Sequence, residues 1–203
     1  MASTHVGTAD AASRILQAAE TLFAAKGYDA VSLNLIASSA AVSKANIFHH
    51  FRSKSDLYFE VLRNAAAASR VDVGNLPAQS DYHERLAAFA RQHLRNYVNH
   101  PTRARLLVRE FLDGTAQIGQ LLTRDEFARN FDQLVNLLKQ GQRSGQLRDS
   151  VDPDLVATLI IAANVFYFRA RVTMRQIGAP IFDQTPDAYS DLITEIILRG
   201  IRT

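Results

Sequence analysis

Hydrophobic residues recur every three or four positions through almost the whole 203-residue chain, and no stretch alternates in the way a half-buried strand does. A period near 3.6 residues is typical of an amphipathic helix. The pattern therefore predicts an all-α fold of about nine helices. The expected ranges are 10–26, 32–39, 43–51, a longer helix opened by residue 53, 81–99, 101–113, 118–143, 152–177 and 186–200.

Polar residues, glycine and proline mark the ends of these predicted helices. Ser32, Ser43 and Ser53 each precede an apolar run, where a serine hydroxyl can accept a hydrogen bond from an unpaired backbone N–H. Gly27 favours the end of the first helix because glycine readily adopts the left-handed conformation. Pro153 stands at a first helical position, where its missing N–H costs nothing.

The clearest break in the helical pattern lies at residues 71–80, which contain glycine, asparagine and proline. This segment is the expected junction in the chain. By function, we expect an N-terminal DNA-binding domain over residues 1–53 and a C-terminal domain over residues 54–203. The helix that follows Ser53 begins the second domain and connects the two.

The composition narrows the class of protein. The chain has no cysteine, which excludes disulfides and thiolate metal sites. It has no signal-peptide pattern, and its longest apolar run, 155–168, is shorter than the roughly 18 residues of a membrane span and contains Thr158 and Asn164. We expect a cytoplasmic protein that does not enter a membrane. The net charge of +3 does not separate nucleic-acid binders from enzymes.

The local charge distribution is more informative. No acidic residue lies between Asp29 and Asp56, whereas Lys44, Arg52, Lys54 and two histidines do. A cationic face without carboxylates suits contact with phosphates. Three positive charges in so short a window also occur on an ordinary solvated surface, so charge alone leaves both interpretations open.

The two short helices at 32–39 and 43–51, with three residues between them, form a helix-turn-helix pattern. The second helix of such a unit enters the DNA major groove with its N-terminal residues facing the bases. Those residues are Lys44, Ala45 and Asn46. Lysine can donate to guanine, asparagine can pair with adenine, and alanine can contact a thymine methyl group.

Further polar residues are expected to contact phosphates. Ser32, Ser43 and Lys54 lie at predicted helix N-termini, where backbone N–H groups favour an anion. His49 adds one more contact. We do not expect His49 and His50 to hold a metal, because adjacent helical residues point about 100° apart and no third ligand is in view.

The segment 31–57, VSLNLIASSAAVSKANIFHHFRSKSDL, resembles the signature of the TetR family of repressors. The resemblance implies a three-helix DNA-binding domain in the first ~50–70 residues. Ala41 and Ala45 replace glycines that are common in the family, so the turn is made without a flexible residue. Phe48 replaces a tyrosine that is common in the family and whose hydroxyl often contacts phosphate, so we expect His49 or His50 to take over that contact. Phe48 itself stays among the expected DNA-binding residues.

The C-terminal part contains an aromatic-rich set of residues with some polar members. The resemblance implies an effector pocket here, and ordinary core packing is the alternative. Two polar members, seven residues apart, share one face of an otherwise apolar helix. A buried polar group needs a hydrogen-bond partner, which here is the ligand, a neighbouring residue or a second subunit. The set comprises Phe89, His93, Tyr97, Phe111, Phe127, Phe131, Asn164, Tyr167, Phe168 and Arg171, and the two polar residues that share a face are Asn164 and Arg171.

The resemblance also implies a homodimer formed by the last two long helices, with Ile193, Ile196 and Ile197 at the interface. Such a dimer binds a palindromic DNA operator and leaves it when a small-molecule effector binds. No catalytic, cofactor or metal motif is present. An all-α protein-interaction module and a small helical enzyme remain the alternatives. The sequence leaves open the operator, the effector, repression or activation, and whether two or four subunits bind one operator.

Overall fold

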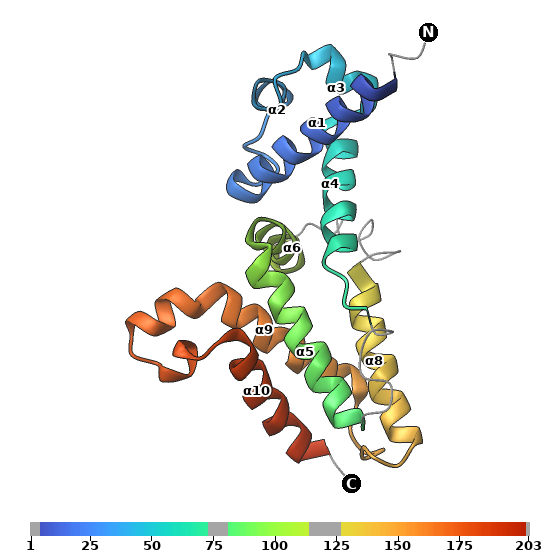
Figure 1. Ribbon diagram of the computed structural model, residues 1–203, viewed down its shortest axis with the longest axis vertical. Helices are drawn as coiled ribbons and strands as arrows, with labels where there is room; N and C mark the ends of the chain where they lie inside the picture. The colour runs from blue at the N-terminus through green and yellow to red at the C-terminus, as the bar shows by residue number, and fades with distance from the viewer. Residues whose placement is uncertain (1–4, 73–80, 114–126, 202–203) are drawn as a thin grey trace. The chain divides into compact units, whose positions relative to one another are not determined.

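A computed structural model of the chain describes residues 5–72, 81–113 and 127–201 (Figure 1). Within these ranges the regular structure consists of nine α-helices and one short 3-10 helix, without a β-strand. The predicted all-α class is confirmed.

The helices lie close to the predicted ranges. The first begins earlier than expected, at residue 5, and the part of the predicted helix 118–143 before residue 127 lies outside the described residues. The elements are α1 (His5–Lys26), α2 (Leu33–Ser39), α3 (Lys44–His50), α4 (Lys54–Ala68), α5 (Tyr82–Asn99), α6 (Pro101–Asp113), α8 (Phe127–Arg143), α9 (Pro153–Gln176), η2 (Pro180–Asp183) and α10 (Pro186–Ile201).

The chain forms two compact units. Unit 1 comprises residues 1–68 and 101–122, and unit 2 comprises residues 69–100 and 123–203. This division follows packing, and the expected functional boundary at 53/54 stays a prediction. The whole of α4 belongs to unit 1 because Leu57, Tyr58 and Val61 are buried where α4 packs against α1 and α6.

Unit 1 is built around α1, which packs against α2, α3, α4 and α6. Its apolar face buries Ile15 and Phe23, and the two short helices contribute the fully buried Ile36 and Ile47. Each such side chain contributes about 1.5–3 kcal/mol when it leaves water. Helices of seven residues are too short to be stable alone, so this packing holds α2 and α3 in place.

Helix α6 is attached to the rest of unit 1 by polar contacts as well as by packing. Two nitrogens of Arg109 donate to the backbone carbonyls of Phe23 (2.9 Å) and Ala24 (3.1 Å), near the C-terminal end of α1. A cation is favourable there because the helix dipole is negative at that end. The Tyr58 hydroxyl donates to the carboxylate of Glu110. These contacts join α6 to α1 and α4.

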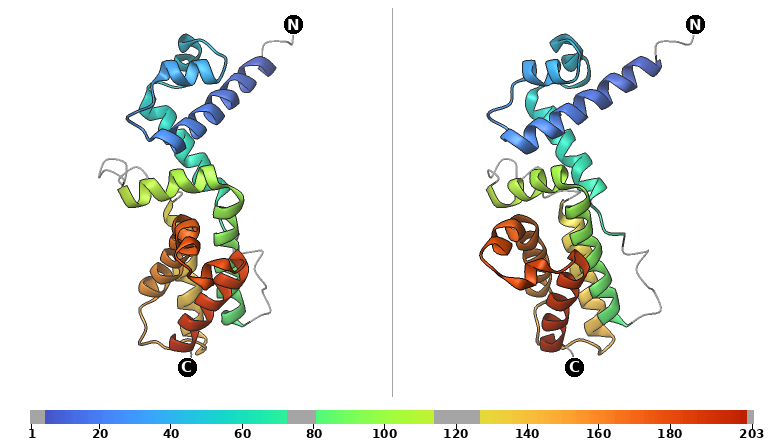
Figure 2. Two further views of the ribbon diagram at one scale, coloured as in Figure 1. Left: turned by 90° about the vertical axis from the view of Figure 1, so that its left-hand side faces the viewer. Right: turned by 60° about the vertical axis from the view of Figure 1, so that its left-hand side comes forward.

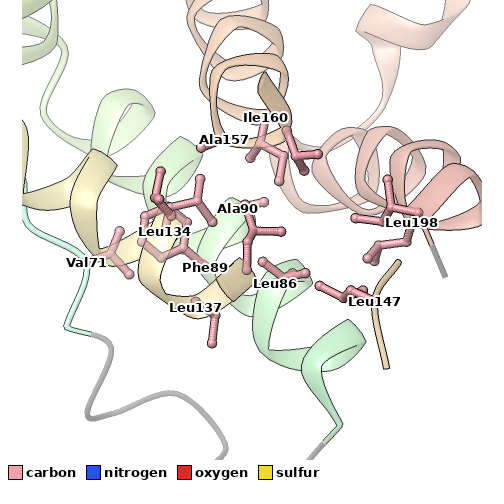
Figure 3. Packing of buried hydrophobic residues seen from close by; sticks show 14 residues of the cluster. Val71, Leu86, Phe89, Ala90, Leu134, Leu137, Leu147, Ala157, Ile160 and Leu198 are labelled. Atoms are coloured by element: carbon pink, nitrogen blue, oxygen red, sulfur yellow. The ribbon is translucent and has the colours of Figure 1, made fainter. Parts of the chain in front are cut away.

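Unit 2 is centred on α5, which packs against α8, α9 and α10 (Figure 2). Its main core is formed by side chains from these four helices together with Val71 and Leu147 (Figure 3). Ion pairs on the surface also join α5 to α10, among them Arg91 with Asp191 at 2.5 Å. Partly exposed pairs of this kind contribute little stability, so the apolar core holds the unit together.

Helix α9 is long and apolar enough to cross a membrane by length and composition, with a mean hydropathy of 1.5 over 18 residues. This corrects the expectation that no segment approaches a membrane span. Only 28% of that stretch is buried within the chain. The chain's own residues therefore leave much of its apolar face uncovered, including the exposed side chains Leu155, Leu159, Phe166 and Val172.

Candidate functional sites

The turn between α2 and α3 contains one strained residue. Ala41 has a φ of +53°, in the left-handed region that favours glycine. The backbone N–H of Val42 donates to the Ala37 carbonyl at 3.0 Å and closes the turn. The sequence indicated that this turn lacks a flexible residue, and the structure shows that alanine takes the strained conformation.

Serine residues cap both helices of the motif, as predicted. The Ser32 hydroxyl accepts from the N–H of Leu35 at 3.2 Å, and the Ser43 hydroxyl accepts from the N–H of Asn46 at 3.1 Å. Both serines are exposed. Because each hydroxyl uses a lone pair for the cap, its own proton is still available to an outside acceptor such as a phosphate oxygen.

The exposed face of α3 carries Lys44, Ala45, Phe48 and His49. The Phe48 side chain is 50% exposed, which is unusual for so large an apolar group. The Lys44 Nζ atom lies 5.9 Å from the centre of its ring. On the opposite face, Ile47 is fully buried and anchors α3 to unit 1. Helix α3 thus presents one basic and apolar face to solvent.

Asn46 is placed differently from its neighbours on α3. Its side chain is partly buried, and its Oδ1 atom is buried without a hydrogen-bond donor among the described residues. A bidentate contact to adenine needs both the oxygen and the nitrogen of the amide. The side chain must therefore rotate outward before it can make the adenine contact that the sequence suggested.

Lys54 lies against the connection between α1 and α2. Its Nζ atom is 4.2 Å from the centre of the Tyr28 ring and 3.5 Å from the backbone carbonyl oxygen of Asp29. A phosphate would have to compete with these two contacts. The predicted cap at the start of α4 is present, because the N–H of Asp56 donates to the Ser53 hydroxyl at 3.0 Å.

Five members of the expected effector set come together between α5 and α9. Phe89, His93 and Tyr97 lie on successive turns of α5, with ring centres 6.2 Å and 4.5 Å apart. Phe168 of α9 lies 5.6 Å from Tyr97, and Asn164 of the same helix contacts His93. We name these five residues the α5–α9 aromatic cluster.

The polar centre of this cluster is buried. Asn164 and His93 are only 1% and 3% exposed. The Asn164 amide nitrogen lies 2.9 Å from the carbonyl oxygen of Ala90 and 3.1 Å from Nδ1 of His93. Burial lowers the pKa of His93 to about 4 and raises the pKa of Tyr97 to about 12. Both side chains are therefore uncharged at neutral pH.

Tyr167 belongs to a second group, which we name the tyrosine cluster and which consists of Tyr167, Phe182 and Tyr189. The Tyr167 ring centre lies 4.4 Å from that of Tyr189 and 5.8 Å from that of Phe182. The hydroxyls of Tyr167 and Tyr189 donate to the backbone carbonyls of Gln184 (3.0 Å) and Ala163 (3.1 Å). Because these hydroxyls already have acceptors within the chain, the tyrosine cluster is core.

The other expected effector residues do not join the α5–α9 aromatic cluster. Phe131 packs partly buried against the main core of unit 2, and Phe111 is 69% exposed and belongs to unit 1. The side chain of Phe127 lies outside the described residues. The Arg171 guanidinium lies 5.4 Å from the centre of the Tyr167 ring and lines an open hollow with two neighbours on α9.

Several groups that organise these sites were not predicted from the sequence. Phe182 and Tyr189 pack against Tyr167, and the Ala90 carbonyl accepts from the Asn164 amide. A backbone carbonyl leaves no trace in side-chain patterns, so nothing could have predicted that contact. The spacing of four residues between Phe89, His93 and Tyr97 was the available signal, because such residues share a helix face.

Comparison with known proteins assigns both parts of the chain. Residues 15–61 match the family model described as bacterial regulatory proteins, tetR family, and residues 83–200 match that of the tetracyclin repressor-like C-terminal domain. The chain belongs to the TetR family. The resemblance that the helix-turn-helix segment indicated is confirmed.

Individual relatives of this TetR-family chain agree. The HTH-type transcriptional regulator RutR of Escherichia coli (strain K12) is 30% identical over 197 residues, covering 93% of this chain and 89% of RutR. A transcriptional regulator of Saccharomonospora viridis, solved in complex with choline, is 27% identical with a TM-score of 0.70, covering 96% and 99% of the two chains. FadR of Bacillus subtilis, solved with stearoyl-CoA, has a TM-score of 0.75 and covers 94% of this chain and 99% of FadR. Its sequence is 19% identical, so this likeness supports the fold alone.

The TetR-family chain is thus a ligand-responsive, DNA-binding transcriptional regulator of the helix-turn-helix type. The comparisons point to a family of regulators and not to a family of enzymes.

Proposed function

We propose that this regulator is a cytoplasmic homodimeric repressor that binds a palindromic operator and leaves it when a small organic effector binds. The observation that carries the proposal is the exposed face of α3, where Lys44, Ala45, Phe48 and His49 lie together. This face combines a cation with apolar groups, and the buried Ile47 on the opposite side of α3 packs the helix into unit 1. Such a face suits the major groove.

Each residue of this surface has a proposed contact. Lys44 donates to guanine, and Ala45 and Phe48 contact thymine methyl groups. The capping hydroxyls of Ser32 and Ser43 donate to phosphates. We further propose phosphate contacts for His49 and Lys54, and a base contact for Asn46 after its side chain rotates outward.

The uncovered apolar face of α9 and α10 supports a homodimer. Ile196 on α10 is 69% exposed, and Leu192 one turn before it is also exposed. Ile193 and Ile197 are partly buried against their own unit, so of the three expected isoleucines Ile196 is best placed to meet a second copy. A two-fold dimer presents its two α3 helices to half-sites about 34–36 Å apart.

The α5–α9 aromatic cluster supports the effector role. It places uncharged polar groups among aromatic rings, as sites for small organic ligands commonly do. The related regulator of Saccharomonospora viridis, 27% identical to this chain, was solved with choline. We propose that a small organic compound likewise binds this chain, at or beside the cluster.

Selection from a random DNA pool at near-physiological salt tests the DNA part of the proposal. The full-length protein is compared with Lys44→Ala and with Lys139→Ala, a matched loss of one exposed lysine on α8. We expect the wild type and Lys139→Ala to enrich the same palindrome, and Lys44→Ala to lose preference at one base pair in each half-site. Enrichment without a motif, equal in all three proteins, would support a protein-interaction module instead.

A further inference from the structure

The orientation of the Asn164 amide is fixed by its neighbours. One end of the amide lies 2.9 Å from the carbonyl oxygen of Ala90. A carbonyl oxygen can only accept a hydrogen bond, so this end must be the NH₂ group of Asn164. The same nitrogen has a second hydrogen, and it lies 3.1 Å from Nδ1 of His93.

The second contact fixes the proton on His93. In a neutral imidazole one nitrogen carries the proton and the other accepts a hydrogen bond. Because Nδ1 accepts from Asn164, the proton must be on Nε2. Burial favours the neutral ring and lowers its pKa to about 4, so this tautomer persists at neutral pH.

The Nε2–H group is a donor without an acceptor among the described residues. Among the described residues, Asn164 is the one hydrogen-bond partner of the His93 ring, and it contacts Nδ1. The aromatic neighbours of the ring are Phe89 and Tyr97, at 6.2 Å and 4.5 Å between ring centres. Nε2 of His93 is not among the fully buried polar atoms that lack a partner, so this donor can be reached by an acceptor from outside the chain, and a ligand that supplies one is favoured.

The cluster carries no charge. None of its five residues is acidic or is a lysine or arginine, and burial keeps His93 and Tyr97 in their uncharged forms at neutral pH. A buried ion without a partner is strongly disfavoured. The surroundings therefore favour an uncharged ligand with an aromatic or heteroaromatic body.

We propose that His93 is a specificity-determining residue of the effector site, and that its Nε2–H donates to a carbonyl oxygen or ring nitrogen of an uncharged aromatic effector. Asn164 acts as a positioning residue, because it fixes which nitrogen of His93 donates. The proposal rests on the proposed effector role of the α5–α9 aromatic cluster.

The tautomer is tested first, on full-length protein labelled with ¹⁵N-histidine. Long-range ¹H–¹⁵N correlation spectra distinguish the Nε2–H tautomer from the Nδ1–H tautomer. We expect His93 to be entirely Nε2–H at pH 7, and Asn164→Asp to shift the proton to Nδ1, because a carboxylate accepts where the amide donated. A wild-type His93 that is Nδ1–H or a mixture of tautomers overturns the proposal without any variant.

Selectivity is tested with three probes of similar size. Acetophenone carries a carbonyl acceptor, ethylbenzene lacks it, and benzyltrimethylammonium carries a positive charge. Because acetophenone can make one hydrogen bond that ethylbenzene cannot, we expect it to bind about tenfold more tightly. We also expect acetophenone to shift the His93 Nε2 resonance. The ratio should fall to about one in His93→Leu and persist in His93→Gln, which keeps a donor.

The outcomes separate this proposal from the effector role on which it rests. Equal binding of acetophenone and ethylbenzene at the cluster, or tightest binding of the cation through the aromatic rings, overturns the role of His93 and keeps the cluster as a binding site. If acetophenone binds as expected and operator affinity does not change, the effector role fails and the selectivity of His93 stands. If no uncharged aromatic fragment shifts the cluster resonances, both proposals fail.

Discussion

The exposed face of α3 and the α5–α9 aromatic cluster place their polar groups in opposite surroundings. On α3, Lys44 and His49 face solvent, and their proposed roles follow from residue type and helical spacing. In the cluster, His93 and Asn164 are buried, and their roles depend on which neighbour takes each hydrogen bond. Exposed sites can be predicted from sequence, whereas buried polar sites need the contacts of the fold.

The same difference predicts how the two sites respond to mutation. Removing an exposed side chain leaves no unpaired group behind, so it changes binding and leaves stability nearly unchanged. Removing a buried polar side chain leaves its partners unpaired, so it lowers the stability of the fold first. Substitutions at the two sites should therefore differ in whether they change stability or DNA binding.

Asn164→Leu is expected to have the largest effect. It leaves the Ala90 carbonyl and the His93 Nδ1 atom without their donor, so the free energy of unfolding should fall by about 2–4 kcal/mol. Urea unfolding of the full-length protein measures this. The control Asn136→Leu, at an exposed position of α8, should change stability by less than about 0.5 kcal/mol. Similar small effects of both variants would contradict the buried pairing.

Lys44→Ala should show the reverse behaviour. We expect operator affinity to fall about 10- to 100-fold, because one base contact is worth about 1–3 kcal/mol. The free energy of unfolding should stay within about 0.5 kcal/mol of the wild type, since Lys44 is exposed. Fluorescence anisotropy and urea unfolding measure the two quantities. A loss of stability with unchanged operator affinity would remove Lys44 from the DNA surface.

Stability should depend on pH through His93. Its pKa is about 4 in the folded protein and about 6.5 when unfolded, so between these values the unfolded chain binds the extra proton. Stability is therefore lost as the pH falls below 6.5, by about 2 kcal/mol between pH 7 and pH 5. Urea unfolding of the wild type beside His93→Gln at pH 5, 6 and 7 measures this. Equal pH dependence in both would show that His93 does not carry the effect.

The smallest effects concern two alanines at family glycine positions. Ala41 has a φ of +53° and Ala45 lies within α3. Ala41→Gly should stabilise the protein by about 0.5–1 kcal/mol because glycine removes the left-handed strain. Ala45→Gly should destabilise it by up to about 1 kcal/mol because glycine weakens a helix. Thermal unfolding compares them, and a shift in the same direction in both would contradict this account of the turn.

Sequence patterns predicted the local features of the molecule well. The caps at Ser32, Ser43 and Ser53 and most helix bounds follow from a few neighbouring residues. The exposed face of α3 follows from the helical period. These features depend on short-range physics, which the order of residues contains directly.

Features that depend on distant contacts were not predicted. Helix α6 belongs to the same compact unit as the N-terminal helices because it packs against α1 and α4. Arg109 contacts the end of α1 through two backbone carbonyls, and the Tyr167 hydroxyl donates to the Gln184 carbonyl. Carbonyl acceptors are the same in every residue, so side-chain patterns do not reveal which one is used.

The central claim is that one chain joins a DNA-reading surface on α3 to an effector site at the α5–α9 aromatic cluster. The most direct test measures operator affinity with and without a compound whose binding at His93 is seen by NMR, in the wild type and in His93→Leu. The account predicts an affinity about 5- to 150-fold weaker when the compound saturates the wild type, the usual range of coupling between two sites. In His93→Leu, which should bind the compound about tenfold more weakly, it predicts a clearly smaller change at a concentration that just saturates the wild type. A compound that saturates the cluster and leaves operator affinity unchanged would contradict the claim.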